Sequence, residues 1–414
     1  MHLMLLLTSF ACACGPIGRR GSNAAGDLPR DAEPPPIAEK VPKTITAHGD
    51  TRIDNYFWLR DKQNPKVMEY LKAEEAYTDA LMKPTVQLQD ALFKEMVGHI
   101  KETDESAPYR RGEYFYFTRT EQGKQYPIIC RRKSAVTGAE EVVLDVNQLA
   151  VGQTFMALGA FEPSDDGHLL AYTTDNVGYR QYTLHVKDLR SGRLLLDQAE
   201  RVDNAAWAAD NRTIFYVTED PTTKRNNKMF RHTLGGGASD LVYEEPNELF
   251  DINVQRTRDR EFILVNGVSK TSTEVRYLPA DKPLSPLKVL QSREPNHEYE
   301  AEHGGHLFYI RTNKGATNFR VVTAPDTDPG EKNWKELIAH QPEVKIASIE
   351  PFAKHLVLTE WENGLQQIEV VDLETQRRHR ITFPEPVYSA DVGDNFVFDT
   401  NLVRYNYGSL VTPG

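Results

Sequence analysis

The sequence predicts an all-β fold, a seven-bladed β-propeller preceded by a short α-helical N-terminal segment. The main observation is a strand-like core of apolar and aromatic residues that recurs roughly every 40 to 55 residues from about residue 110 onward. Each core is followed, after a turn, by a second alternating strand. About seven such units, with about four short strands each, are typical of a propeller. A sandwich of independent β domains is the alternative, and it explains the even spacing less well.

The repeated cores are short and rich in β-branched and aromatic residues, as expected of strands. They lie at 114–118 (YFYFT), 169–173 (LLAYT), 214–218 (IFYVT), 262–265 (FILV), 307–310 (LFYI), 355–359 (HLVLT) and 395–398 (NFVF). The strands that follow the cores are expected at 126–130, 181–186, 228–232, 274–278, 318–322 and 366–371. Turn-forming residues such as those at 164–167 (SDDG) precede the cores.

The composition bounds the class of protein. Hydrophobic residues make up 39% and charged residues 26% of the 414 residues, so the chain can bury a core and wholesale disorder is excluded. No apolar run approaches the roughly 18 residues of a membrane-spanning helix. A net charge of −11 argues against a nucleic-acid partner, and the basic run at 224–228 lacks the aromatic residues that stack on bases.

The first 14 residues resemble a signal-peptide leader. The apolar run at 3–14 is too short to span a bilayer but suits the apolar region of a signal peptide. A cysteine after a small residue also resembles a bacterial lipoprotein signal, with Cys12 or Cys14 as the lipidated residue. We therefore predict an exported protein, periplasmic or lipid-anchored to the cell envelope, and a cytoplasmic one if the leader is mis-annotated. Residues 15–40 are rich in Gly, Pro and charge and predict a flexible linker.

Residues 41–107 are expected to form a helical N-terminal segment, followed by the propeller domain at 108–414. The apolar period becomes helical over 65–100, and Pro84 should divide it into two helices. Asn64 is suited to cap the first helix, with Pro65 at its first position. Cys130 is the only cysteine beyond residue 14, so a disulfide-stapled fold is excluded and a buried apolar role is expected.

Several polar motifs could in principle form binding or catalytic sites, and a turn explains each of them better. His303 and His306 are three residues apart but lack further ligands at a fixed spacing, so no metal site is predicted. Gly235–Gly237 is expected to form a hairpin turn rather than a phosphate loop. Asp165–Asp166 and Asp203 could act as paired carboxylates, but aspartate in a blade-edge turn caps backbone groups. No catalytic residue and no cofactor is predicted.

Four stretches resemble a known family. The sequence DNYFWLRD at 54–61 resembles the N-terminal signature of the prolyl oligopeptidase family of serine peptidases. The stretches 100–133, 312–322 and 404–413 are similar more specifically to oligopeptidase B. The resemblance implies a short N-terminal segment, a seven-bladed propeller that restricts access to peptides, and a C-terminal α/β-hydrolase domain that carries the catalytic Ser, Asp and His. It also implies cleavage after Arg or Lys.

The C-terminal α/β-hydrolase domain of the family is expected to be absent from this chain. A nucleophile elbow needs the pattern G-x-S-x-G, which occurs nowhere in the sequence. We therefore predict the substrate-gating part of a serine endopeptidase, inactive alone. Its expected partners are a peptide substrate and the hydrolase domain, in cis or in trans. Arg180, in the hairpin at 175–182, is a candidate for an interdomain salt bridge, with an ordinary exposed arginine as the alternative.

A second hypothesis is an exported, non-catalytic propeller that binds a peptide or protein partner. The absent nucleophile and the predicted lipid anchor favour it. The apolar helical faces within about 54–107 count against it, because an exposed apolar patch needs a partner. A propeller enzyme such as a glycosidase or lyase would need convergent carboxylates in the channel, and the sequence does not point to any.

Overall fold

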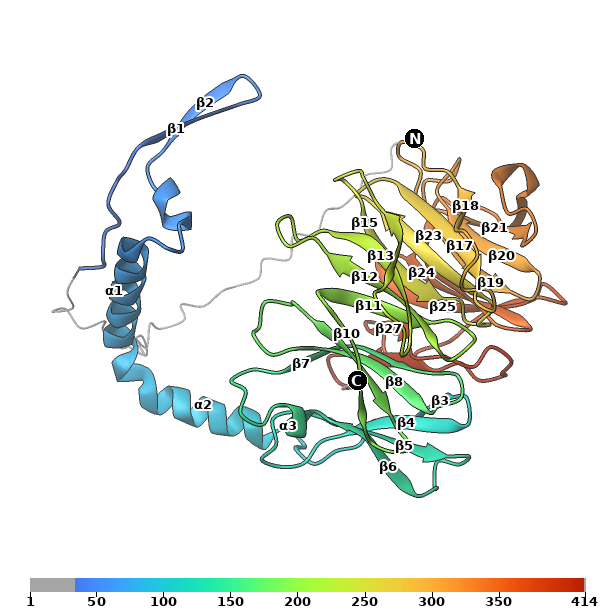
Figure 1. The fold of residues 1–414 in the computed structure, drawn as a ribbon, viewed down its shortest axis with the longest axis horizontal. Coiled ribbons are helices and arrows are strands. Elements are labelled where there is room, and N and C mark those ends of the chain that lie inside the picture. The colour runs from blue at the N-terminus through green and yellow to red at the C-terminus, as the bar shows by residue number, and fades with distance from the viewer. Residues whose placement is uncertain (1–33, 413–414) are drawn as a thin grey trace, which may run out of the picture. The chain divides into compact units, whose positions relative to one another are not determined.

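The computed structural model describes residues 34–412, which fall into two compact units, one ending at Lys101 and one beginning at Glu102. The leader, with Cys12 and Cys14, and most of the predicted linker lie outside the described residues. Within the described part of the chain, no helix is long and apolar enough to cross a membrane. Figure 1 shows the ribbon, with helices α1 and α2 in the first unit and the strands from β3 onward in the second.

The first unit contains a hairpin and two helices. Strands β1 (Lys43–Ala47) and β2 (Asp50–Asp54) pair antiparallel and lead through the short helix η1 (Phe57–Arg60) into α1 (Pro65–Met82). The 3-10 turn η2 (Lys83–Thr85) separates α1 from α2 (Val86–Gly98). The expected division at Pro84 is confirmed, because proline cannot supply the N–H that a continuous helix needs there. The expected cap is also confirmed, since the Asn64 side chain accepts a hydrogen bond from the Lys66 N–H at 3.1 Å.

Both helices of this unit leave their apolar side chains exposed. The side chains at least 46% exposed are Met68, Leu71, Met82, Val86, Leu88, Leu92, Phe93, Met96 and Ile100. Among the described residues up to Lys101, Val67 is the one buried hydrophobic residue. The unit therefore has no hydrophobic core of its own, and its helices present an apolar surface suited to packing against another surface.

The second unit is built from seven consecutive antiparallel sheets, six of four strands and a last one of two. The first three sheets contain β3 (Tyr109–Arg111), β4 (Tyr114–Arg119), β5 (Ile128–Lys133), β6 (Glu140–Asp145); β7 (Ala157–Pro163), β8 (Leu169–Asp175), β9 (Thr183–Asp188), β10 (Leu194–Glu200); and β11 (Val202–Trp207), β12 (Thr213–Glu219), β13 (Asn226–Thr233), β14 (Asp240–Glu244). The short helix α3 (Val146–Leu149) follows β6.

The last four sheets contain β15 (Asp251–Arg256), β16 (Phe262–Val268), β17 (Thr273–Pro279), β18 (Lys288–Gln291); β19 (Tyr299–Gly304), β20 (Leu307–Thr312), β21 (Arg320–Pro325), β22 (Lys335–Ile338); β23 (Val344–Pro351), β24 (His355–Glu362), β25 (Leu365–Asp372), β26 (Arg378–Arg380); and β27 (Ser389–Val392) with β28 (Tyr405–Gly408). The short helix η3 (Glu331–Asn333) precedes β22.

In every sheet the strands lie side by side in chain order, and six hydrophobic clusters each join one sheet of the second unit to the next. First strands of neighbouring sheets contact each other, as β7 does β11 and β11 does β15, so the first strands are innermost. This arrangement is a seven-bladed β-propeller, and the expected fold class is confirmed. Each blade buries its faces against its two neighbours, because a lone sheet of this size cannot cover its own apolar side chains.

Two local expectations are wrong. Residues 395–398 form a loop between β27 and β28 rather than a strand, because the Asn395 side chain takes over the pairing. Its Nδ2 donates to the carbonyl oxygen of Arg404 at 2.9 Å, and its Oδ1 accepts from the Arg404 N–H at 2.8 Å. Asp203 lies on the inner strand β11 rather than in a blade-edge turn, because β11 begins directly after β10 without a polar loop.

The other turn and burial expectations are confirmed. Gly235–Gly237 connects β13 to β14, and Gly305 and His306 connect β19 to β20. Asp165–Asp166 lies in the turn between β7 and β8. Cys130 is fully buried on β5, and burial raises the pKa of its thiol to about 11.

Side chains, not strand pairing, join the first blade to the last. Arg404 donates to the carbonyl oxygens of Pro108 and of Ala107, the latter at 2.9 Å. The rings of Tyr109 and Phe396 lie 5.2 Å apart between centroids. The first and last blades are therefore joined by side-chain contacts, which can separate without breaking the hydrogen bonds of a sheet.

Candidate functional site

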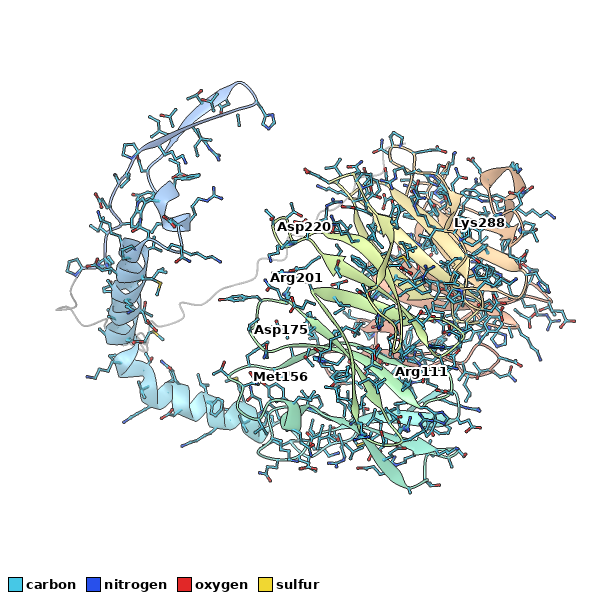
Figure 2. The ribbon with its side chains drawn as sticks, viewed as in Figure 1. Arg111, Met156, Asp175, Arg201, Asp220 and Lys288 are labelled. Carbon is cyan, nitrogen blue, oxygen red and sulfur yellow. The ribbon has the colours of Figure 1, made fainter. Side chains whose placement is uncertain are left out.

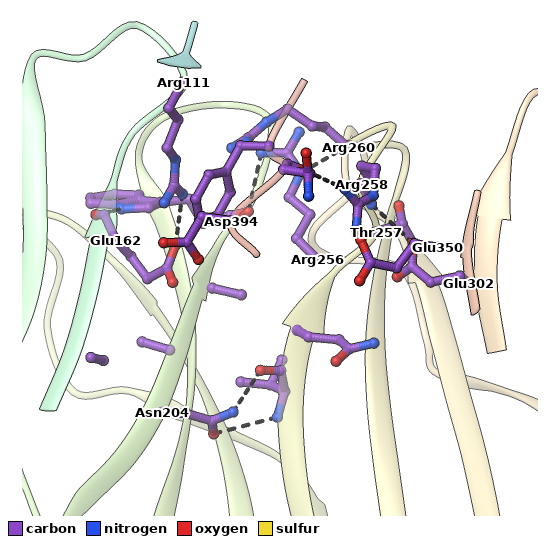
Figure 3. A pocket seen from close by; sticks show the side chains of 18 of the residues that line it. Arg111, Glu162, Asn204, Arg256, Thr257, Arg258, Arg260, Glu302, Glu350 and Asp394 are labelled. Carbon is purple, nitrogen blue, oxygen red and sulfur yellow. Dashed lines mark hydrogen bonds and ion pairs between the residues drawn. The ribbon is translucent and has the colours of Figure 1, made fainter. Parts of the chain in front are cut away.

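A cavity of about 470 Å³ lies on the axis of the propeller, where the first strands of all blades end. Figure 3 shows it lined by side chains that project from several inner strands. The charged and amide residues around it are Arg111, Glu162, Asp203, Asn204, Gln255, Arg256, Arg258, Arg260, Glu302, Glu350, Asp394 and Asn395. Arginine, carboxylate and amide side chains dominate the lining, and such groups are suited to binding or gating.

Ion pairs cross this end of the channel between blades that are not neighbours. Arg256 on β15 donates to Asp165, between β7 and β8, at 2.8 Å, and Arg260 also pairs with Asp165. These contacts join the fourth blade to the second. Arg258 reaches the other way, to the Glu350 carboxylate of the sixth blade and to the Asn395 carbonyl of the loop after β27. Arg258 therefore reaches past the fifth blade and connects the fourth blade to the sixth and seventh.

Neighbouring blades are also joined at this end. The Arg111 guanidinium, which is 10% exposed, donates to the Glu162 carboxylate at 2.6 Å. The Arg258 N–H donates to the Glu302 carboxylate at 3.1 Å. Every blade thus contributes a charged side chain or a carbonyl to one set of contacts across the axis. The third contributes the Trp207 carbonyl, which accepts from the Arg256 guanidinium at 3.3 Å, and Asn211, whose Oδ1 accepts from the Asp165 N–H at 2.7 Å.

Burial shifts the proton affinity of the acidic groups here. It raises the pKa of Glu302 to about 8, and the facing Arg258 offsets this only in part. Burial also raises the pKa of Glu350 above its ordinary value, although Arg258 pulls in the opposite direction. Near neutral pH Glu302 therefore retains a proton that an exposed glutamate would have lost.

We expect Glu302→Gln to change the pH dependence of stability. Between the ordinary pKa of 4.5 and the folded pKa of about 8, the folded state binds a proton that the unfolded state has released, so wild-type stability falls as pH rises. The slope from this single group is about 1.4 kcal/mol per pH unit at most. The glutamine variant should lose this slope, measured by urea unfolding at several pH values across that window.

The matched control is Glu300→Gln on the same strand, whose side chain is 39% exposed and paired with Arg311. It should keep the wild-type slope. Parallel pH profiles for wild type and Glu302→Gln would contradict the assignment of a buried, protonated Glu302.

Arg180, the predicted interdomain residue, lies at the opposite end of the propeller. It occupies the turn between β8 and β9, is exposed, and has a φ of +58°. The buried Asp175 holds this turn by accepting from the N–H groups of Arg180 at 2.7 Å, Val177 at 2.9 Å and Gly178 at 3.1 Å. Within residues 34–412 no side chain forms an ion pair with the Arg180 guanidinium. The turn therefore presents a positively charged side chain without a partner in its own blade.

The chain enters and leaves the propeller at the same end as Arg180. First strands begin there and second strands end there, because neighbouring strands are antiparallel. Tyr109 begins the first strand of the first blade, and Gly408 ends the second strand of the last. Figure 2 shows Met156, Asp175, Arg201 and Asp220 along this edge, with Arg111 away from it.

Sequence reasoning missed the arginines and glutamates of the cavity. Their one common signal is a charged residue at the carboxyl end of a first strand, as with Arg256 on β15 and Glu350 on β23. That signal is weak, because charged residues also end ordinary exposed strands.

The fold and cavity define a class of protein, a seven-bladed propeller with an axial channel. Ion pairs cross one end of the channel, and the chain enters and leaves the propeller at the other end. Residues 35–414 match the family model described as prolyl oligopeptidase, N-terminal beta-propeller domain. The chain belongs to the prolyl oligopeptidase family.

Curated relatives and solved structures agree with this assignment. The chain is 39% identical over 407 residues to dipeptidyl aminopeptidase BI of Pseudoxanthomonas mexicana, covering 93% of this chain and 56% of that protein. It is 33% identical to protease 2 of Moraxella lacunata, covering 91% and 56%. The structure of oligopeptidase B from Leishmania major matches with a TM-score of 0.85 at 29% identity, covering 92% of this chain and 58% of that one. The chain thus spans a little over half the length of these relatives.

Proposed function

We propose that this chain is the N-terminal and propeller part of an oligopeptidase B-like serine endopeptidase that cleaves short peptides after Arg or Lys. The likeness to oligopeptidase B over nine-tenths of the chain supports this proposal most directly. In this proposal the Ser, His and Asp of the catalytic triad belong to an α/β-hydrolase domain, in cis or in trans. The propeller acts as a filter that admits flexible peptides and rejects folded proteins.

The different structures of the two ends of the propeller support different functions for them. The ion pairs of Arg256, Arg258 and Arg260 tie blades together across the far end, so a peptide would meet a charged closure there. The end that presents Arg180 is where a domain following residue 414 would be attached, since β28 runs toward it. We assign substrate gating to the channel and docking of the hydrolase domain to the Arg180 end. Arg180 would pair there with a carboxylate of that domain.

The activity test compares the 414-residue chain with a fusion to the residues of Moraxella lacunata protease 2 that follow its matched segment. The fusion should cleave a peptide with one internal Arg, and the chain alone should not. A second peptide with a free N-terminus and no Arg or Lys tests for dipeptide release, which the name of the Pseudoxanthomonas relative suggests. Cleavage by the unfused chain, or dipeptide release in place of cleavage after Arg, would overturn the proposal.

The same fusion tests the docking role of Arg180. An exposed ion pair contributes up to about 1 kcal/mol, so Arg180→Glu should lower kcat/KM by up to about fivefold. The matched control is Arg190→Glu, in the turn between β9 and β10 at the other end of the same blade, which should leave kcat/KM unchanged. Equal effects of the two charge reversals on kcat/KM would show that Arg180 does not dock the hydrolase domain.

For the leader we propose export, with Cys12 or Cys14 as the site of lipid attachment. Its similarity to a lipoprotein signal supports this, and labelling with radioactive palmitate in a bacterial host tests it. Loss of label in the Cys12→Ser, Cys14→Ser double variant is expected. An exported propeller that binds a partner without catalysis remains the alternative function, and an inactive fusion with a monodisperse, soluble 414-residue chain would favour it.

A further inference from the structure

A buried histidine in the fifth blade has one ring nitrogen without a partner. His303 on β19 is 1% exposed, and its Nδ1 lies 2.5 Å from Oδ2 of Asp259. Within the described residues, its Nε2 is buried and has no hydrogen-bond partner. A buried polar atom without a partner is costly, and native proteins rarely leave one. Nε2 of His303 is therefore a candidate atom for binding a ligand.

The surroundings hold the ring in a fixed orientation. In the tautomer that donates from Nδ1 to the Asp259 carboxylate, the lone pair of Nε2 is available to a metal ion. Asp259 is itself fixed, because its Oδ1 accepts from the Thr257 hydroxyl at 2.8 Å. The rings of Phe262 and Phe308 pack edge-on at 4.6 and 5.0 Å between centroids. A carboxylate on one nitrogen is how proteins orient histidines that ligate zinc with the other.

Two further donors lie next to this nitrogen. Oδ2 of Asp326 is 3.7 Å from His303 Nε2 and 3.8 Å from His306 Nδ1. Zinc–ligand bonds of about 2.0–2.2 Å place two ligands of one tetrahedral ion roughly 3.3–3.6 Å apart. The Asp326 N–H donates to the His306 carbonyl at 3.1 Å, which ties the two ligands together through the backbone. Each histidine nitrogen is thus within a few tenths of an ångström of the distance from Asp326 that a shared ion requires.

Within residues 34–412, no three such side chains already lie at metal-ligand distances, so one of them has to move. The His306 side chain is 98% exposed and follows Gly305, whose φ is +68°. It can rotate about its side-chain bonds at little cost. A cavity of about 390 Å³, lined also by Glu261 and Phe398, leaves room for a water in the fourth position.

We propose that His303, His306 and Asp326 bind one divalent transition-metal ion of the zinc type, with Asp259 orienting His303. Neutral imidazole and carboxylate are ligands that zinc accepts, and three protein ligands with one open position form a known coordination pattern. The ion joins the β19–β20 turn to the residue that follows β21, and through Asp259 to the fourth blade. The site does not depend on the peptidase proposal, since it lies wholly within the propeller.

The test uses the untagged 414-residue chain with Cys12 and Cys14 changed to serine, because thiolates in the leader would bind zinc themselves. After treatment with a chelator, the protein is titrated with Zn²⁺ by calorimetry and with Co²⁺ by visible absorption. We expect one ion per chain and a cobalt spectrum without thiolate bands. His306→Ala and Asp326→Asn change partly or fully exposed side chains, and each should raise the Kd at least about 10-fold.

The matched control is His168→Ala. His168 also lies beside an aspartate, with Nδ1 3.2 Å from Asp166, but its side chain is 45% exposed rather than buried. Its removal should leave the Kd unchanged, and circular dichroism checks that every variant is folded. Absence of one-to-one binding, or an unchanged Kd in both His306→Ala and Asp326→Asn, would overturn the proposal.

Discussion

Replacing Trp207 with alanine is expected to lower the free energy of unfolding of the propeller by about 3–5 kcal/mol. Trp207 is 2% exposed at the end of β11 and belongs to the hydrophobic cluster between the second and third blades. Its indole N–H also donates to the Glu162 carbonyl of β7 at 2.7 Å. The alanine variant therefore loses an interblade core and leaves a carbonyl without its donor. Because Glu162 lines the channel, the same change should loosen its pairing with Arg111.

Chemical denaturation of wild type, Trp207→Ala and Trp207→Phe measures the two contributions separately. The phenylalanine variant keeps most of the volume and should lose about 1–3 kcal/mol through the unpaired carbonyl. Trp361→Ala is the control, since that side chain is 43% exposed on β24 and should cost much less. A Trp207→Ala variant as stable as Trp361→Ala would show that the blade interface does not depend on this side chain.

The second large effect is expected for Glu245→Gln, again about 3–5 kcal/mol at neutral pH. The Glu245 side chain is fully buried after β14 and accepts from the Arg293 guanidinium and from the Tyr243 hydroxyl, each at 2.6 Å. Arg293 in turn reaches Glu274 on β17 at 3.1 Å, so the network joins the third blade to the fourth. Removing the charge of Glu245 leaves a guanidinium with one of its two carboxylate partners lost.

The sign of the pH dependence follows from the pKa of Glu245. Burial alone would raise this pKa, but hydrogen bonds from Arg293, Tyr243 and the Asn247 N–H hold it below the ordinary 4.5. The ionised group therefore stabilises the fold above pH 4.5, and this contribution is lost as pH falls through the lowered folded pKa. The gap between wild type and Glu245→Gln should narrow in acid. Glu244→Gln is the neighbouring control, with a half-exposed side chain 3.6 Å from Lys228 and an expected effect of about 0–1 kcal/mol. A gap that widens in acid would contradict the network.

The repeated strands were predictable because each obeys a local rule. Short continuous apolar runs along β4, β8, β12, β16, β20 and β24 mark the strands that are buried on both faces within a blade. The division of the helical segment at Pro84 and the cap at Asn64 also depend on neighbouring residues alone. The error at 395–398 has the same origin, since the alternating letters NFVF are compatible with a strand, while the Asn395 side chain pairs with Arg404 nine residues away.

The channel could not be predicted, because its residues come from seven blades. Arg258 and Glu350 are 92 residues apart, and Arg258 and Asn395 are 137 apart. No spacing rule connects such residues before the ring has closed. The same holds for His303 and His306, whose sequence spacing indicates only a turn. The turn is present, and the carboxylates of Asp259 and Asp326 that surround the imidazole lie 44 and 23 residues from His303.

By itself the sequence determined the fold class, the number of blades and the resemblance to a peptidase family, because propeller blades repeat and each repeat records its own strand pattern. Only the tertiary structure decided which charges face the axis, that Arg180 and the chain connections share one end, and that a buried histidine has a free nitrogen. The physical reason is that burial and pairing of charged groups depend on distances between blades, which are set when the ring closes and not by any local run of residues.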